Sequence, residues 1–348
     1  MLLFLFLSLY KINVFGMRNL RSLNKGLFRY HNLKIPMKRT IIPFFRPFYF
    51  LLTIITLVSC EDKDEPELDD SVPFDAQEYV DFESGNIPLI LSVPHGGDLK
   101  PGEILNRTCN DAVSVMDEFT IELAQTIMDE FAKAGQKPYL IINKMHRSKM
   151  DANRNREDAT CGDKNAQAVW DLFHGQIQNS MVSISTKFQK GLFIDLHGHG
   201  NPKQRVELGY LLYEDELGLP DATLNSPALL EVSSIRNLVK DNPAGASHTD
   251  ILKGDNAFGT LLDQAGFAAV PSSVDPVPLA SDNYFSGGYN TVNYSSFKGG
   301  TIDGIQVECN RTGLRDTAEN RQAFAVAFVS TAIAYLEAHY FNEIPVKN

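Results

Sequence analysis

Short runs of apolar residues alternate along the chain with longer segments in which apolar residues recur every three or four positions. The run Ile87–Val93 (IPLILSV) predicts a buried strand, and the stripe within Asp111–Gly135 predicts a helix. Further strands are predicted at Pro138–Asn143, Leu192–His197, Gly209–Tyr213, Ala268–Pro271 and Gly304–Cys309, and further helices at Asp163–Phe188, Ser226–Val239, Asn256–Ala265 and Asp316–Tyr340. Strands that alternate with helices predict an α/β domain with a largely parallel sheet.

The first 59 residues differ from this pattern. They contain nine Lys and Arg residues and no acidic residue, and Met37 opens a basic segment followed by the apolar stretch 47–58. That stretch is shorter than the ~20 residues of a membrane span but suits a signal peptide. We interpret residues 1–59 as a signal segment, with Met37 as an alternative start. Small residues before Cys60 predict a lipidated, exported bacterial lipoprotein, periplasmic or on the cell surface; an ordinary signal anchor is the alternative.

Residues 60–85 are rich in acidic residues and predict a disordered tether, followed by one folded domain over 86–348. The whole chain has a formal net charge of −11, and the part after residue 59 carries −20. Such a charge repels phosphate backbones, so we expect no nucleic-acid partner. We expect contact with the membrane only through the lipid anchor.

The chain has four cysteines, and an exported compartment permits a disulfide among those that carry no lipid. Cys109 and Cys161 both lie in polar, loop-like segments, whereas Cys309 lies in an apolar strand pattern. We favour a Cys109–Cys161 bridge on this basis, although sequence alone does not fix the connectivity.

Two predicted strands end in histidine and glycine. His95 follows Ile87–Val93 in the turn PHGG, and His197 closes the strand in GLFIDLHGHG. Ligands of α/β sheets gather at the carboxyl ends of the strands, so these two imidazoles are candidate zinc ligands. A histidine that follows a strand is otherwise a hydrogen-bonded loop residue.

A catalytic zinc site needs a third protein ligand, and Asp117, near the start of the first predicted helix, is our choice. Glu122 and Asp98 are the alternatives. We expect Asp195 and His199, which flank His197, to lie behind the ligands, with Asp195 orienting one of them.

Glu308 lies in the apolar strand GIQVEC, where a buried carboxylate is costly unless it is paired or used. It is a candidate general base. The alternative is a salt bridge to Arg311 or Arg315.

The basic segment 146–156 follows a predicted strand and contains Arg147, Asn153 and Arg154. Guanidinium groups bind carboxylates in bidentate geometry, so these residues are candidates to hold an acidic substrate. The alternative is a solvated basic loop. The segment 282–291 has the Tyr and Gly content of an active-site flap or of a plain surface loop.

These motifs occur in a recognisable order over residues 87–312: PHGG, an Asp early in the next helix, Arg147-x-x-x-Asp151-x-Asn153-Arg154, DLHGHG and a late QVE strand. The set resembles the N-formylglutamate amidohydrolase family, although the first turn of that family is more typically PHSG. The resemblance implies a three-layer αβα sandwich around a mixed, largely parallel sheet, similar to that of the zinc carboxypeptidases.

The resemblance also implies one zinc ion per chain, with His95, Asp117 and His197 as ligands and Glu308 as general base. The implied reaction is hydrolysis of N-formyl-L-glutamate or of a related N-acyl or γ-glutamyl substrate, whose carboxylate meets Arg147, Asn153 and Arg154. The export signal leaves open a hydrolase of peptidoglycan or peptides. It also leaves open a surface lipoprotein that binds an acidic ligand without turnover; a purely structural surface protein fits the α/β pattern less well.

Overall fold

A computed structural model of the chain describes residues 74–109 and 111–347, so the predicted signal segment and Cys60 lie outside the described residues. The strands are β1 Val80–Glu83, β2 Leu89–Val93, β3 Tyr139–Asn143, β4 Gly191–His199, β5 Val206–Gly209, β6 Ala269–Val270 and β7 Ile302–Asn310. The longer helices are α2 Thr120–Ala132, α4 Lys164–Phe188, α10 Phe258–Gln264 and α12 Ala318–His339. The shorter helices and turns are η1 Ala76–Tyr79, α3 Arg156–Thr160, α5 Glu214–Leu217, α6 Asp221–Leu224, α7 Pro227–Glu231, α8 Arg236–Lys240, α9 His248–Lys253, α11 Tyr289–Asn293, η2 Ser296–Lys298 and η3 Arg311–Arg315.

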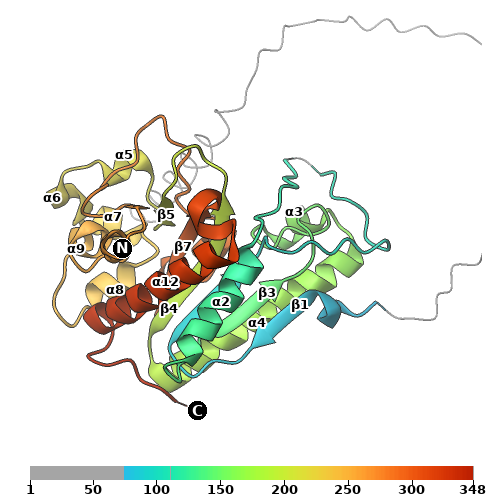
Figure 1. The fold of residues 1–348 in the computed structure, drawn as a ribbon, viewed down its shortest axis with the longest axis horizontal. Coiled ribbons are helices and arrows are strands. Elements are labelled where there is room, and N and C mark those ends of the chain that lie inside the picture. The colour runs from blue at the N-terminus through green and yellow to red at the C-terminus, as the bar shows by residue number, and fades with distance from the viewer. Residues whose placement is uncertain (1–73, 110, 348) are drawn as a thin grey trace, which may run out of the picture. The chain divides into compact units, whose positions relative to one another are not determined.

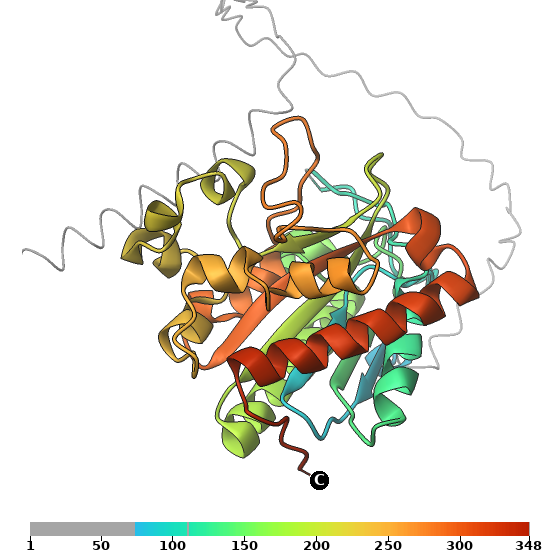
Figure 2. The same cartoon turned by 60° about the vertical axis from the view of Figure 1, so that its left-hand side comes forward.

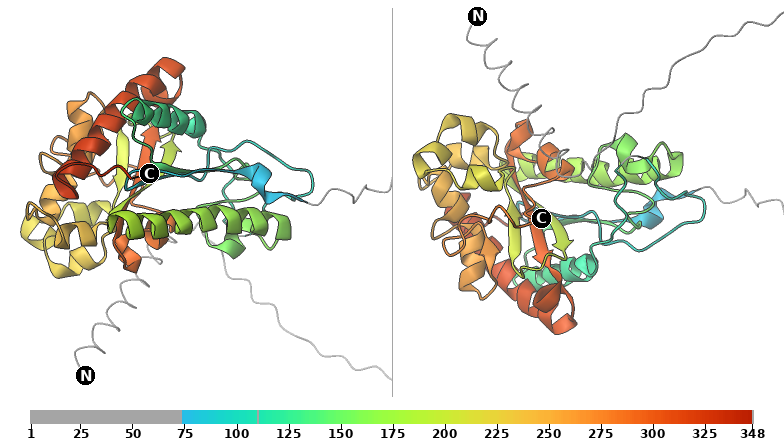
Figure 3. Two further views of the ribbon diagram at one scale, coloured as in Figure 1. Left: turned by 90° about the horizontal axis from the view of Figure 1, so that it is seen from below. Right: turned by 90° about the horizontal axis from the view of Figure 1, so that it is seen from above.

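The described strands form one sheet in the order β1-β3-β2-β4-β7-β5-β6. The central strands β3, β2, β4 and β7 are parallel, β1 is antiparallel to β3, and β5 is antiparallel to β7. Helices α2 and α12 cover one face and α4 covers the other, as the views from below and above show (Figures 1 and 3). The short helices α5–α9 gather beyond the β5 side of the sheet (Figure 2). The predicted α/β class, with a mixed and largely parallel sheet, is confirmed.

The central strands are buried along almost their whole length because both of their faces are covered. In β2, Leu89, Leu91 and Val93 belong to the core beneath α2 and α12, whereas Ile90 belongs to the core beneath α4. Because β2 and β4 are parallel neighbours, their carboxyl ends lie side by side at one edge of the sheet. This edge is where His95 and His197 lie.

The first helix is shorter than predicted. It begins at Thr120, so residues 111–119 form a loop and Asp117 precedes the helix instead of lying within it. Phe119 has a φ of 65°, a left-handed conformation that interrupts helical geometry at this point. The predicted helix over 226–239 is likewise divided into α7 and α8, because Ser234 between them bonds to Gly304 of β7.

Ordered structure begins earlier than the boundary we predicted at residue 86. Tyr79 ends a short 3-10 turn, and β1 then pairs with β3. Acidic side chains of this segment do not repel one another because Asp81 pairs with Lys144, and Glu83 with Lys137. The predicted tether therefore does not extend over Ala76–Glu83.

The disulfide between Cys109 and Cys161 is present, as predicted. The Cys309 thiol is buried and free. Within residues 74–109 and 111–347, no helix is long and apolar enough to cross a membrane.

Candidate metal centre

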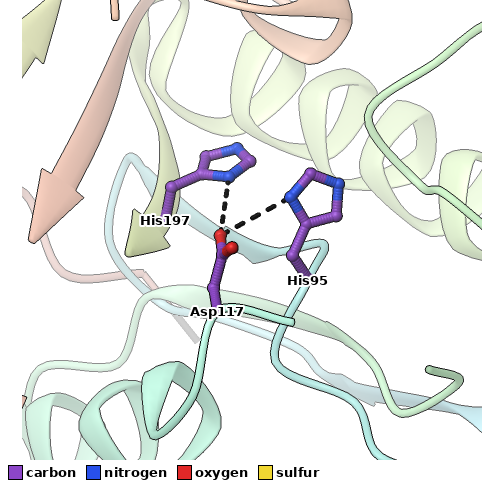
Figure 4. A group of neighbouring side chains, drawn as sticks. All are labelled: His95, Asp117 and His197. Carbon is purple, nitrogen blue, oxygen red and sulfur yellow. Dashed lines mark hydrogen bonds and ion pairs between the residues drawn. The ribbon is translucent and has the colours of Figure 1, made fainter. Parts of the chain in front are cut away.

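Three side chains from three separate segments converge at the carboxyl edge of the sheet (Figure 4). His95 follows β2, His197 lies near the end of β4, and Asp117 comes from the loop before α2. Asp117 Oδ2 lies 3.5 Å from His95 Nδ1 and 3.2 Å from His197 Nδ1. The three candidate ligand atoms all lie within 4.8 Å of one another, and all three residues are buried. The alternatives Glu122 and Asp98 are exposed and stand outside this group.

The outward nitrogen of each imidazole meets a carboxylate. His95 Nε2 lies 2.6 Å from Asp151 Oδ1, and His197 Nε2 lies 2.8 Å from Asp195 Oδ2. A carboxylate behind a histidine holds the proton on that nitrogen and leaves the other nitrogen free to bind a metal. Asp195 thus occupies the orienting position expected from its place beside His197.

The inward atoms fit a metal ion. His95 Nδ1 is buried and has no hydrogen-bond partner among the described residues. Two imidazole nitrogens and one carboxylate form a donor set that zinc prefers, and three protein ligands are typical of catalytic zinc sites. The arrangement of His95, Asp117 and His197 is consistent with a metal ion such as zinc.

The pKa shifts of Asp117 and His197 are also consistent with a bound cation. Burial alone would raise the pKa of Asp117, but the adjacent imidazoles of His197 and His95 hold it well below its usual range. Burial opposes protonation of His197, yet the charge of Asp195 and hydrogen bonds to Asp117 and Asp195 raise its pKa well above the usual value. The pocket therefore attracts positive charge between the three side chains, a charge that a bound cation supplies in place of protons.

Glu308 lies beside this group on β7. It is the register partner of His197 on β4, and its exposed fraction is 5%. Burial raises the pKa of Glu308 to about 7; the charge of His197 opposes the rise, and the charge of Asp117 adds to it. Gln306 Nε2 donates a 2.9 Å hydrogen bond to Oε1 of Glu308.

The alternative role of Glu308 was a salt bridge to Arg311 or Arg315. Among the described residues, both arginines have other partners. Arg311 pairs with Glu118 at 2.9 Å. Arg315 donates to the backbone carbonyls of Cys309 and His199. Neither guanidinium forms an ion pair with the buried carboxylate of Glu308.

The basic segment wraps around Asp151. The Nε atoms of Arg147 and Arg154 lie 3.0 and 3.2 Å from Asp151 Oδ2, and Arg107 Nη1 lies 3.6 Å away. Arg147 and Arg154 keep 18% and 27% of their side-chain surface exposed. Their Nη atoms also donate to backbone carbonyls, Arg147 to Val115 at 3.5 Å and Arg154 to Asp111 at 2.8 Å.

Asn153 and His199 lie in different surroundings. Asn153 Nδ2 lies 3.2 Å from His197 Nε2, and its Oδ1 accepts a bond from the backbone N–H of Asn290. Asn153 therefore touches a candidate ligand directly. His199 is bonded to the carbonyl of Arg205 and to the N–H of Asn201, so it supports the turn between β4 and β5.

Two acidic residues of the site had no predicted role in it. Asp151 appeared only as one position of a motif, although it contacts His95 and the two partly buried arginines Arg147 and Arg154. Glu207 was assigned no role, but it is 1% exposed and faces Glu308 across β5 and β7. The sequence indicated part of this, because Glu207 is an acidic residue within the apolar run VELG.

No family model and no curated protein matches the chain. Among solved structures, it is similar to an N-formylglutamate amidohydrolase from Ralstonia eutropha JMP134, with 13% identity over 74% of this chain and 97% of that one and a TM-score of 0.44. A gene product from Agrobacterium tumefaciens is similar at 12% identity, over 74% and 94% of the two chains, with a TM-score of 0.44. An N-acetylmuramyl-L-alanine amidase from Mycobacterium abscessus is similar at 13% identity, over 71% and 98%, with a TM-score of 0.29.

Proposed function

We propose that this protein is a zinc-dependent amidohydrolase that cleaves an amide bond on an acidic amino acid. The observation that carries the proposal is the convergence of His95, Asp117 and His197 beside the buried carboxylate of Glu308. The simplest substrate is N-formyl-L-glutamate, which would give formate and L-glutamate. Related N-acyl and γ-glutamyl substrates present the same groups to the site.

The three candidate ligands would hold one zinc ion per chain. A zinc ion bound there supplies a Lewis acid that polarises a carbonyl and makes water more acidic. The chain itself holds the two imidazoles in place through Asp151 and Asp195, and it keeps the ligands 3–7% exposed. Exclusion of bulk water strengthens every electrostatic interaction in such a site.

Glu308 is the general base of the proposed reaction. It accepts the proton of the attacking water and later delivers that proton to the leaving amine nitrogen. Gln306 binds Oε1 and so fixes the carboxylate, which leaves Oε2 to receive the proton. A carboxylate whose pKa lies near neutrality is suited to both steps.

Arg147 and Arg154 bind the carboxylate of the substrate. Their Nε atoms are held by Oδ2 of Asp151, whose Oδ1 contacts the ligand His95, and both side chains keep part of their surface exposed. Fixed guanidinium groups recognise carboxylates with little loss of side-chain freedom. We further propose, from the sequence alone, that Cys60 anchors the enzyme on the outside of the cell or in the periplasm.

The test is formate release from N-formyl-L-glutamate by the purified protein, with zinc measured on the same sample and a chelator control. Asp117→Asn should lose zinc, whereas Asp98→Asn, its matched exposed control, should keep it. Chelator-sensitive turnover with about one zinc per chain supports the proposal. Bound zinc without turnover would redirect the search to peptide and polymer amides, and a chain without zinc would overturn the proposal.

A further inference from the structure

Arg315, in η3 between β7 and α12, contacts two of the three segments that build the candidate metal centre, the loop that carries Asp117 and strand β4, and also strand β7, which carries Glu308. Its Nε donates to the carbonyl of Cys309 at 3.0 Å, and its Nη2 donates to the carbonyl of His199 at 3.2 Å. Its Nη1 donates to the carbonyl of Glu118. The guanidinium thus holds three backbone carbonyls that are far apart in the sequence.

Each of these carbonyls lies one or two residues from a site residue. Glu118 follows Asp117, Cys309 follows Glu308, and His199 is two residues beyond His197. Arg315 is itself only 2% exposed and reaches no solvent-facing surface of the site. Its bonds therefore act on the placement of ligand and base, and it does not contact a substrate.

Gly198 shows how closely the guanidinium packs against β4. A Cβ added at Gly198 would lie 2.6 Å from both Nη atoms of Arg315 and closer still to Cζ. Real Cβ atoms do not approach other heavy atoms so closely, so any larger residue would displace the guanidinium. The glycine between the two histidines of DLHGHG is thus explained by Arg315.

The loop that carries Asp117 has a backbone conformation that contacts with its surroundings must hold in place. Phe119 holds a left-handed backbone conformation with a φ of 65°. A non-glycine residue in this region costs of order 1 kcal/mol or more and keeps it only when its surroundings impose it. The bond from Arg315 to Glu118, directly before Phe119, is such a restraint, and Arg321 stacks over the Phe119 ring at 5.3 Å.

We infer that Arg315 is the positioning residue that fixes Asp117, His197 and Glu308 relative to one another, with Gly198 as the space it requires. The inference rests on the proposed function for its catalytic meaning. A guanidinium presents several N–H groups in one rigid plane, whereas an ammonium group is a single point. Lysine at this position cannot hold three separate carbonyls in the same geometry.

The experiment compares Arg315→Lys with Arg311→Lys. Arg311 is a matched arginine of the same turn that is exposed, pairs with the Glu118 side chain and lies over the Phe119 ring at 5.8 Å, but its side chain donates to no carbonyl of the site among the described residues. Zinc affinity is measured by competition with a chelator. The kinetic constants kcat and KM are measured on the amide substrate, and hydrogen exchange is measured on the metal-free protein. For Arg315→Lys we expect zinc affinity and kcat each to fall about tenfold or more, with KM within about twofold. KM is spared because Arg147 and Arg154 lie on another segment. Arg311→Lys should match the wild type.

Gly198→Ala provides a second route that keeps Arg315 in the chain. It should reproduce the loss of zinc affinity and kcat in the wild-type background. In an Arg315→Ala background it should cost little more, because the added methyl group no longer meets a guanidinium. Free guanidinium ion should restore part of the kcat of Arg315→Ala.

The outcomes separate this inference from the proposed function. If the wild type binds zinc and Arg315→Lys keeps both its zinc affinity and its kcat, the inference is wrong. Additive losses in Gly198→Ala and Arg315→Ala would also overturn it. If the wild type binds no zinc, the proposed function is wrong, and hydrogen exchange then tests the positioning role of Arg315 by itself. Faster exchange in Arg315→Lys at Gly198, near Glu118 and around Cys309 together would then support the positioning role, and unchanged exchange would refute it.

Discussion

Glu207 and Glu308 are direct cross-strand partners on β5 and β7, and their exposed fractions are only 1% and 5%. The nearest cation to Glu207 is Arg205, whose Nη2 lies 3.9 Å from its Oε1. Two buried carboxylates side by side cannot both ionise without cost. After burial itself and the opposing charge of His197, the charges of Asp117 and Glu207 contribute to the raised pKa of Glu308.

Glu207→Gln should therefore lower the pKa of Glu308. Because the general base must be ionised, the acid limb of the kcat/KM profile should move to lower pH in this variant. The measurement is the pH profile of kcat/KM for both proteins. Glu83→Gln, on β1 at the opposite edge of the sheet, is the control and should leave the profile in place. An acid limb that stays fixed in Glu207→Gln would mean that Glu308 does not control it.

Glu308→Gln should abolish most of the turnover while keeping the metal. The amide has nearly the shape of the carboxylate but cannot accept a proton, and general-base catalysis contributes about 10²- to 10⁴-fold. We expect kcat to fall by about that factor with zinc content unchanged. Glu122→Gln, an exposed carboxylate on α2, is the matched control. Full activity in Glu308→Gln would assign the base elsewhere.

The strands and turns of the site were predictable because local patterns encode them. β2, β4 and β7 each contain apolar residues typical of strands that are covered on both faces, and each carries a polar group within the strand or directly after it. The rule that ligands gather at strand ends then places His95, His197 and Glu308 near one another. The Cys109–Cys161 bridge was also predictable from the environment of each cysteine.

What local patterns missed depends on contacts between distant residues. Asp117 was expected within a helix, but it lies in the loop before α2, where the carbonyl of Glu118 accepts a hydrogen bond from Arg315, 197 residues further along the chain. Asp151 lies 56 residues from His95, and no periodicity brings the two together. Glu207 faces Glu308 only because β5 runs antiparallel to β7 in one particular register. The spacing of apolar residues in 111–119, which predicted a helix, does not indicate these long-range contacts.

Asp151→Asn should weaken both metal binding and substrate binding. The change removes the negative charge that accepts from His95 and anchors Arg147 and Arg154. Loss of a carboxylate behind a metal-binding histidine typically lowers metal affinity by about 10- to 100-fold. We expect that loss together with a higher KM, measured by chelator competition and steady-state kinetics. Asp158→Asn, exposed in the same segment, should change neither quantity, and an unchanged zinc affinity in Asp151→Asn would contradict the orienting role.

Removal of the Cys109–Cys161 bridge should destabilise the fold. The bridge spans a sequence separation of 52 residues, for which loss of the cross-link costs about 4 kcal/mol through the entropy of the unfolded chain. Urea unfolding of Cys109→Ser/Cys161→Ser should show a free energy of unfolding lower by roughly that amount. A reductant should lower the stability of the wild type but not of the variant, since Cys309 forms no bridge. Equal stabilities would show that packing alone holds the loop before α2.

Asp303, in β7 away from the metal centre, should give the fold a specific dependence on pH. Burial raises its pKa to about 6 from a usual 3.8, despite hydrogen bonds from Ser296, Leu238 and Tyr340. The folded state therefore binds this proton more tightly than the unfolded state does. Its contribution to the free energy of unfolding is fully present below pH 4 and is lost as the pH rises through about 6. A difference of about two pKa units corresponds to roughly 3 kcal/mol.

Asp303→Asn removes this titration while keeping the shape of the side chain. The difference in unfolding free energy, variant minus wild type, should thus rise by roughly 3 kcal/mol between pH 4 and pH 8, since the wild type alone carries a buried charge at the higher pH. Urea unfolding of both proteins at several pH values measures that difference, and groups that titrate equally in both cancel out of it. Asp241→Asn, an exposed aspartate, is the control and should run parallel to the wild type. Parallel profiles for Asp303→Asn would mean that the carboxyl group of Asp303 titrates alike in the folded and unfolded chains.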